Sequence, residues 1–153
     1  MNQDTICAIA TAQGGAIGCI RVSGLDAIEI TSRIFTPARK GKKLKDAKPY
    51  TLTFGHIHEE ENIIDEVLVS LFRAPHSYTG EDSTEIMCHG SSYILQKVLQ
   101  LLIGNDLSDD GGQACASRRA NAAGNLCVRG FYIRVIARIH QNVRTFTANH
   151  HIT

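Results

Sequence analysis

Residues 5–22 read TICAIATAQGGAIGCIRV, and two short apolar runs stand out in this stretch. Residues 5–11 and 17–22 are partly β-branched, which predicts a strand in each. Residues 12–16 (AQGGA) predict a tight turn between the strands, where glycine provides backbone freedom. A phosphate-binding loop fits less well, because no Lys-Ser or Lys-Thr pair follows the glycines and the chain continues as a strand.

The residues that follow the second strand predict a helix. Residues 23–26 (SGLD) fit a capping box, with Ser23 at the cap and an acid three residues later. Three apolar residues then recur at the spacing of one helix face, namely Ala27, Ile30 and Ile34. Pro37 limits the helix, because the residue before a proline avoids helical angles.

A hairpin is predicted between residues 50 and 72. Residues 50–58 (YTLTFGHIH) and 63–72 (IIDEVLVSLF) have the composition of strands, and the polar residues 59–62 (EEEN) join them. Side chains of the second strand alternate between two faces. One face takes Val67, Val69 and Leu71, and the other takes Leu68, Ser70 and Phe72.

A loop, a strand and a second helix complete the pattern. Residues 73–83 (RAPHSYTGEDS) are rich in turn formers, residues 84–89 (TEIMCH) predict a strand, and residues 93–103 have helical spacing. Gly104 is a good helix stop. This order of elements lacks a regular β-α-β alternation, so it predicts an α+β fold with a mixed or antiparallel sheet and two helices.

The composition is that of one globular domain, with 153 residues, 43% hydrophobic and 20% charged. No apolar run approaches the ~20 residues that cross a bilayer, and residues 1–4 lack the order of a signal peptide. We therefore expect a cytoplasmic protein that contacts no membrane. The five cysteines form no C-x-x-C pair, which favours reduced thiols, and we expect Cys7 and Cys19 to be buried packing residues.

Charge divides the chain near residue 104. The net charge of +1 combines −2 over residues 1–104 with +3 over residues 105–153, a stretch with six Arg but no Lys and no Glu. We therefore treat the two parts separately. Within the second part, residues 131–146 fit a basic amphipathic helix, and residues 131–136 also fit a strand.

Residues 38–48 (ARKGKKLKDAK) form a basic run, with six Lys or Arg and one acid. A solvated loop is the interpretation that we favour. The alternative is a loop that faces RNA, because Lys and Arg neutralise phosphates without any base contact.

Two other groupings suggest chemistry and are discounted. His56, His58, His76 and His89 lie on different segments, and nothing fixes a ligand geometry, so we predict no metal site. Cys88 and His89 are neighbours on a strand and point to opposite faces. They could not share a proton as a nucleophile and its base.

Arg21 and Glu85 are charged residues within otherwise apolar strands. Leaving such a charge buried and unpaired is costly, so each needs a partner or a ligand. One interpretation is that the two pair with each other or lie at a sheet edge. Equally, they could line a pocket, where a guanidinium suits a carboxylate or carbonyl and a carboxylate suits an N–H-rich heterocycle.

Two long segments around these residues resemble a known family. Residues 4–11 (DTICAIAT) and 14–24 (GGAIGCIRVSG) are similar to the D-T-I-x-A-x-A-T…G-G-x-G-x-x-R-x-S-G opening of the MnmE (TrmE) tRNA modification GTPases. Residues 74–90 (APHSYTGEDSTEIMCHG) resemble the family's P-x-S-[FY]-T-G-E-D-x-x-E-x-x-x-H-G segment. Residues 1–104 are thus identified as the family's N-terminal domain.

The resemblance implies an α+β domain, like the folate-binding domains of one-carbon enzymes, that forms a homodimer. It implies 5-formyl- or 5,10-methylene-tetrahydrofolate as cofactor, with Arg21 and Glu85 as contacts. We expect Glu85 to take the pterin N–H groups bidentately, with His89 and Asp82 as candidate pocket neighbours. Full-length members work with an FAD-dependent MnmG (GidA) partner and modify C5 of the wobble uridine of certain tRNAs.

The chain also departs from the family. It has no G-x-x-x-x-G-K-[ST] loop, so we expect this chain to need no GTP, K+ or Mg2+ and to be no catalyst alone. The family would continue past residue 104 with a segment whose Lys completes the folate pocket, and residues 105–153 lack it. Our hypothesis is a frame shift or a wrongly predicted gene end after Gly104, which sequencing of the locus would test.

Three functions therefore compete. The first is an incomplete folate-binding and dimerisation domain over residues 1–104, followed by an atypical Arg-rich tail over 105–153 that is frame-shifted or disordered. The second is a basic RNA-binding or scaffold fragment, which would use residues 39–48 and the Arg-rich tail. The third is a non-functional gene fragment. Folate carries the one-carbon chemistry in the first, so the chain itself would supply binding and orientation.

Overall fold

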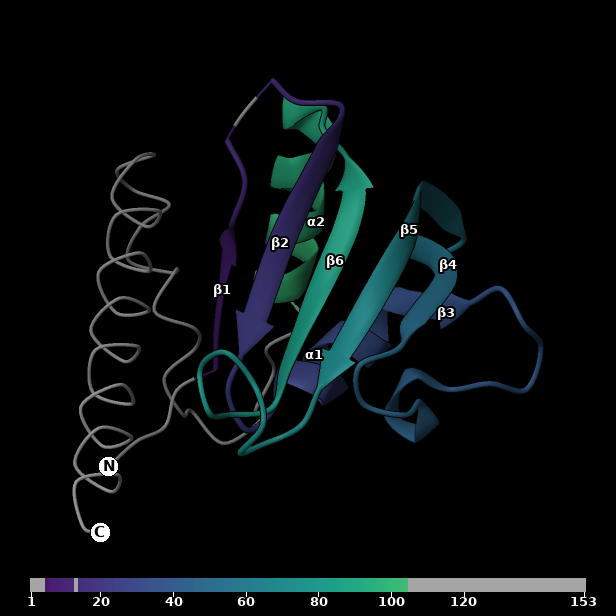
Figure 1. The fold of residues 1–153 in the computed structure, drawn as a ribbon. Helices are drawn as coiled ribbons and strands as arrows, with labels where there is room; N and C mark the ends of the chain where they lie inside the picture. Colours follow the sequence, from purple (N-terminus) through teal and green to yellow (C-terminus); the bar gives the residue numbers. More distant parts are fainter. Residues whose placement is uncertain (1–4, 13, 105–153) are drawn as a thin grey trace, which may run out of the picture.

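The computed structural model describes residues 5–12 and 14–104, which form one six-stranded sheet with two α-helices (Figure 1). The elements follow in the order β1 (Ile6–Ile9), β2 (Ile17–Ser23), α1 (Ala27–Ile34), β3 (Phe35–Pro37), η1 (Leu44–Asp46), β4 (Leu52–Glu59), β5 (Asn62–Phe72), β6 (Ser83–His89) and α2 (Ser92–Gly104). The strand order is β1-β2-β6-β5-β4-β3, and every neighbouring pair is antiparallel. The predicted α+β class is confirmed, and the sheet is antiparallel rather than mixed.

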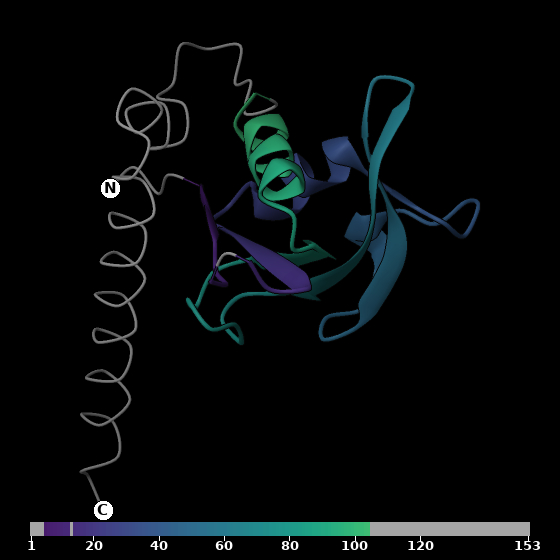
Figure 2. The ribbon, with the colours of Figure 1, turned by 90° about the horizontal axis from the view of Figure 1, so that it is seen from above.

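Both helices cover the same face of the sheet and leave the other face open (Figures 1 and 2). The core lies between this covered face and the helices, and it takes alternate residues of the central strands. Its fully buried side chains from those strands include Ile20, Val22, Val67, Val69, Leu71 and Ile86. α2 contributes Leu95, Val98 and Leu102, and α1 contributes Ala27, Ile30 and Ile34.

The hairpin of β4 and β5 confirms the prediction for residues 50–72. The two strands pair from Leu52 opposite Ser70 to Glu59 opposite Asn62, so the turn falls at the predicted acidic residues. The predicted alternation is also present, because Val67, Val69 and Leu71 are at most 2% exposed while Leu68 is 38% exposed. Ser70, on the same face as Leu68, is nevertheless buried.

The predicted capping box is wrong. Ser23 is the last residue of β2, and its buried hydroxyl forms a hydrogen bond with Thr79 Oγ1 at 2.7 Å. The N-cap of α1 is Asp26, which makes no side-chain capping bond. Gly24 separates strand from helix with a φ of +139°, and a Cβ there would collide with Thr5, so only glycine fits this turn.

The structure adds β3 and η1, which the sequence pattern did not predict. β3 has three residues, continues directly from α1 and lies at the sheet edge, where Pro37 ends the strand. An edge is where a sheet tolerates proline, because no partner needs its missing N–H. Because β3 begins at Phe35, helix α1 ends at Ile34, before the limit that Pro37 sets.

Predictions for residues 105–153 fall outside the described residues, and they include the helix or strand between 131 and 146. Within the described part, neither helix combines the length and the apolar character that crossing a membrane requires.

Candidate binding site

Arg21 and Glu85 lie directly opposite each other on β2 and β6, which are both interior strands. Arg21 Nε and Nη2 both donate to Glu85 Oε1, at 2.8 and 2.5 Å. The side chains are 22% and 24% exposed, and they lie on the open face of the sheet. Of the alternatives left by the sequence, mutual pairing is what the structure shows, and it places the pair at the centre of the sheet rather than at its edge.

The pair keeps capacity for a ligand. Within the described residues, Glu85 Oε2 and Arg21 Nη1 make no hydrogen bond, so one acceptor and one donor remain. The ring of the exposed Tyr78 lies 4.9 Å from Arg21 Cζ, close enough for a cation–π contact. A flat, polar heterocycle could therefore meet a carboxylate oxygen, a guanidinium and an aromatic ring at one place.

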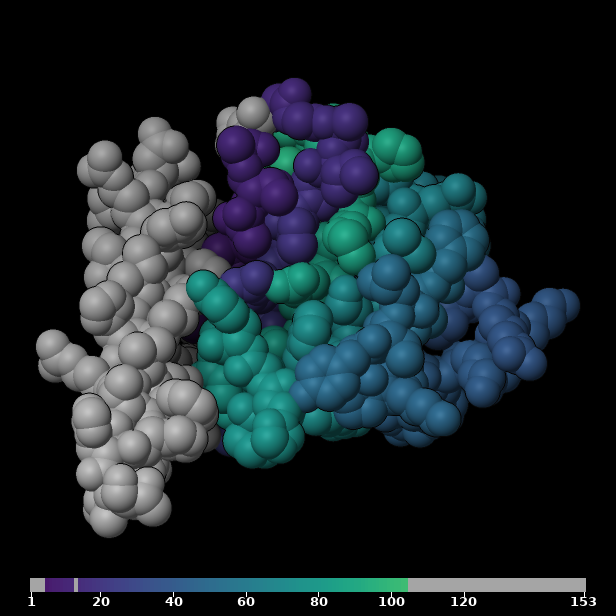
Figure 3. Space-filling model, viewed as in Figure 1, coloured from purple at the N-terminus to yellow at the C-terminus, as the bar shows by residue number. Residues whose placement is uncertain are grey.

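The loop that carries Tyr78, residues 73–82, is held by its own hydrogen bonds beside β2 (Figure 3). Asp82 accepts from Arg73 Nη1 at 3.1 Å and from the Ala74 N–H at 2.9 Å. The Gly24 N–H donates to the Asp82 carbonyl at 2.9 Å, which ties the loop to the end of β2. The Asp82 carboxylate thus shapes the loop, and its role as a pocket neighbour stays a prediction.

His89 and Asp65 form a second side-chain pair, between β6 and β5. The Asp65 side chain is only 8% exposed, and it accepts from the His89 backbone N–H at 2.9 Å and pairs with Nδ1 at 2.6 Å. This holds the ring in place while its 72% exposed side chain presents Nε2 outward. His89 shares the open face with Glu85 but is four residues away, about 13 Å along a strand, so its place in the same pocket stays a prediction.

Asp65 is a residue that the sequence analysis missed. It lies within the apolar run 63–72, just as Arg21 and Glu85 lie within theirs, so the same argument about charges in apolar strands would have selected it.

The cysteines of the two central strands are poor nucleophiles. Burial raises the pKa of the Cys19 thiol to about 11, with Glu85 adding to the effect and Arg21 opposing it. Burial also raises the pKa of Cys88 to about 11, helped by the nearby charge of Asp65. Cys7 is buried as predicted, but Cys19 is only partly buried and lies on the open face beside the ion pair, so the prediction for Cys19 is wrong. Cys88 and His89 do point to opposite faces, as predicted.

The remaining histidines of the hairpin are separated by an irregularity. The register of β4 and β5 shifts between Ile57 and His58. His56 lies 3.6 Å from Glu66, whereas His58 Nε2 is 2.8 Å from Thr36 Oγ1. Among residues 5–12 and 14–104, no group of three His, Cys, Asp or Glu side chains has the arrangement of a metal site.

Comparison with known proteins supports the family resemblance. A family model described as "GTP-binding protein TrmE N-terminus" matches residues 5–133. The tRNA modification GTPase MnmE of Bacteroides fragilis (strain YCH46) is 80% identical over 105 residues, which is 69% of this chain and 23% of that protein. MnmE of Phocaeicola vulgatus is 61% identical over 138 residues (69% and 27%), and that of Flavobacterium johnsoniae is 49% identical over 114 residues (72% and 24%).

These findings define an α+β domain that matches the N-terminal family model. The chain belongs to the TrmE (MnmE) family, because the family model covers most of its length. It spans about a quarter of the length of the curated relatives that it matches. The family match extends past residue 104, so the domain boundary at that position stays a prediction.

Proposed function

We propose that this chain is a tetrahydrofolate-binding and dimerisation domain of a protein that modifies C5 of the wobble uridine in tRNA. The family match and the relatives, which are named tRNA modification GTPases, support the process. In this proposal the complete protein acts in the cytoplasm with a flavin-dependent MnmG-type partner. The Arg21–Glu85 pair is the observation that carries the assignment of folate to this domain.

The residues at the pair fit a one-carbon folate. The Glu85 oxygen that Arg21 leaves open, Oε2, can accept a pterin N–H, while bidentate binding would also need Oε1, which now accepts from Arg21. The Arg21 guanidinium can donate to a carbonyl or carboxylate of the same ligand. The bound folate would supply the one-carbon unit, and the protein residues would bind and orient it.

Titration calorimetry with 5-formyltetrahydrofolate tests this function on the full chain. We expect saturable binding that Arg21→Ala and Glu85→Ala each weaken by about tenfold or more, because each loses a charge-assisted hydrogen bond. Lys97→Gln is a matched control, since it breaks the ion pair with Glu59 at 2.7 Å and its side chain is 25% exposed, close to that of Arg21.

Two outcomes would overturn the folate proposal. One is an absence of binding by a folded chain, and the other is equal binding by the wild type and both site variants. Sedimentation of the same samples, with and without the folate, tests the proposed homodimer separately.

A further inference from the structure

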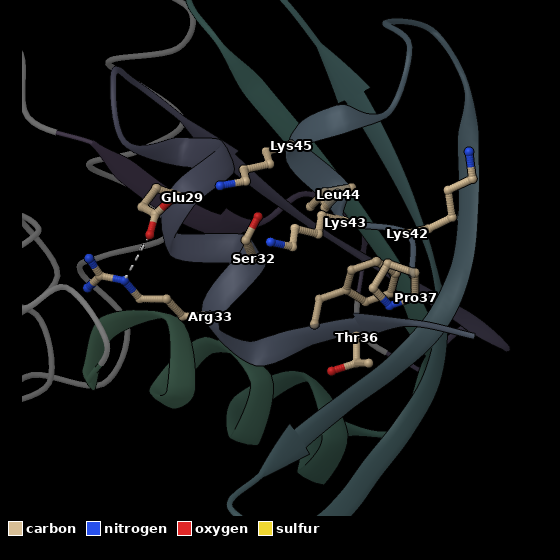
Figure 4. Close-up of a pocket in the computed structure, with 10 residues that line it drawn as sticks. Glu29, Ser32, Arg33, Thr36, Pro37, Lys42, Lys43, Leu44 and Lys45 are labelled. Atoms are coloured by element: carbon tan, nitrogen blue, oxygen red, sulfur yellow. Dashed lines mark ion pairs between the residues drawn. The ribbon is translucent and has the colours of Figure 1, made fainter. Parts of the chain in front are cut away.

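A pocket of about 350 Å³ lies on the helix side of the sheet, away from Arg21 and Glu85 (Figure 4). α1 and the loop of residues 38–48 form two of its walls, and Phe35, Thr36 and Pro37 of β3 also contribute. Its polar lining residues are Glu29, Ser32 and Arg33 from α1 and Lys42, Lys43 and Lys45 from the loop.

The pocket is strongly positive. Four cations line it against one carboxylate, that of Glu29, which lies 3.7 Å from Arg33 in an i,i+4 pair. None of the three lysines forms an ion pair within the part of the chain that the structure describes. Figure 4 shows Lys43 and Lys45 reaching toward α1, while Lys42 extends away from it. The lining thus has three lysine charges with no ion-pair partner among the described residues.

The backbone that carries the lysines is anchored to the rest of the domain, unlike the backbone of a fully solvated loop. Leu44 is only 2% exposed and packs into the core between Lys43 and Lys45. Arg73 Nη2 donates to the Lys45 carbonyl at 3.0 Å, and the Ala47 N–H donates to the Leu44 carbonyl at 3.0 Å. Anchoring of the backbone lowers the entropy that would be lost when the lysines close on a ligand.

We propose that this pocket binds a phosphate group of an RNA backbone. Lysine ammonium groups neutralise phosphates as point charges and need no particular base sequence. The Ser32 hydroxyl already donates to the Ile28 carbonyl at 2.7 Å, so the lysines and Arg33 supply the donors. The choice of RNA among polyanions rests on the proposed function in tRNA modification, while the positive pocket stands on the structure alone.

The pocket would give the domain two separate ligand surfaces. The folate proposed above lies on the open face, and the RNA phosphate would lie beside α1 on the covered face. The two proposed sites therefore use different residues, and substitutions can remove either site without altering the other.

Fluorescence anisotropy of labelled tRNA, titrated with the full 153-residue chain from about 50 to 300 mM KCl, tests the pocket. We expect Lys43→Gln/Lys45→Gln to weaken binding roughly tenfold and to lower the slope of log affinity against log salt by about one to two. Arg39→Gln/Lys40→Gln is the matched control, because it removes the same charge from the same loop outside the pocket lining. We expect it to weaken binding by less than about twofold, while Glu29→Gln strengthens binding.

Every site of substitution is an exposed side chain, so folding is not at risk. Equal losses from the two double variants would overturn the pocket in favour of a diffuse attraction by the basic loop. An absence of tRNA binding by the wild type would overturn it too. The folate titration separates the two proposals, because the pocket variant should bind 5-formyltetrahydrofolate like the wild type. Loss of folate binding alone counts only against the proposed function, and loss of RNA binding alone counts only against the pocket.

Discussion

The covered face and the open face of the sheet are built from alternate residues of the same strands. On β6, Ile86 and Cys88 face the helices at 0% and 3% exposure, while Glu85 and His89 face the other way. A shift of one residue in strand register would exchange the two sets. The apolar contacts with α1 and α2 therefore fix where the charged groups of the open face lie.

The two faces also differ in what a substitution should do. The covered face is packed to high density, so a lost methyl group leaves a cavity. The open face is partly solvated, so losing a charged partner there should alter ligand binding more than it alters folding. The four predictions below test this division, from the largest expected effect on the protein to the smallest.

Ile86→Ala should be the most damaging change. Ile86 is fully buried between β2 and β5, and its truncation should lower the free energy of unfolding by about 2–5 kcal/mol. Urea unfolding measures the loss. Met87→Ala is the control, because the neighbouring side chain points to the open face and should cost clearly less. Equal losses for the two would contradict the division between the faces.

Asp65→Ala should come next. This carboxylate is 8% exposed and receives two hydrogen bonds from His89, so its removal should destabilise the chain by about 1–3 kcal/mol. Glu66→Ala is the control on the adjacent residue, whose side chain is 65% exposed and only 3.6 Å from His56. Its effect should stay within about 0.5 kcal/mol. A neutral Asp65→Ala would mean that water replaces the carboxylate as the partner of His89 without cost.

The sequence predicted those elements in which apolar residues recur at one regular spacing over a long segment. β5 and α2 have such a period, and the predicted ranges agree with the structure within a residue or two. β3 could not be predicted, because three residues carry no period and its pairing depends on β4. A Cβ at Gly55 would collide with Thr36 and Phe35, so this close approach of β4 to β3 is a tertiary feature.

For the candidate site, the sequence predicted which residues take part but not how they are arranged. A charge within an apolar strand identified Arg21 and Glu85, but the sequence could not distinguish mutual pairing from an open pocket. That distinction depends on the β2–β6 register, which brings the two residues opposite each other. Similarly, Ser23 had a capping pattern, but its hydroxyl bonds to Thr79, a residue 56 positions away.

Glu85→Gln should have a small effect on stability. The pair is partly solvated and adds modestly to folding, so we expect a loss of about 1 kcal/mol or less in urea unfolding. Arg21→Gln should behave in the same way. A loss above about 2 kcal/mol in either variant would show that the pair mainly stabilises the sheet, which would weaken the case for a ligand there.

Cys19 offers a sensitive test of the open face, because both charges of the site act on the pKa of its thiol. With the pKa raised to about 11, the thiolate is scarce at neutral pH, and the rate of alkylation by iodoacetamide should rise about tenfold per pH unit from 7 to 9. Glu85 raises this pKa and Arg21 lowers it, so Glu85→Gln should speed the alkylation at pH 8 and Arg21→Gln should slow it. Mass spectrometry of the modified peptides measures alkylation of Cys19 separately from that of the other cysteines. Cys88 serves as the buried reference. Shifts of the same sign in both variants would mean that the substitutions act by exposing the thiol rather than by removing charge.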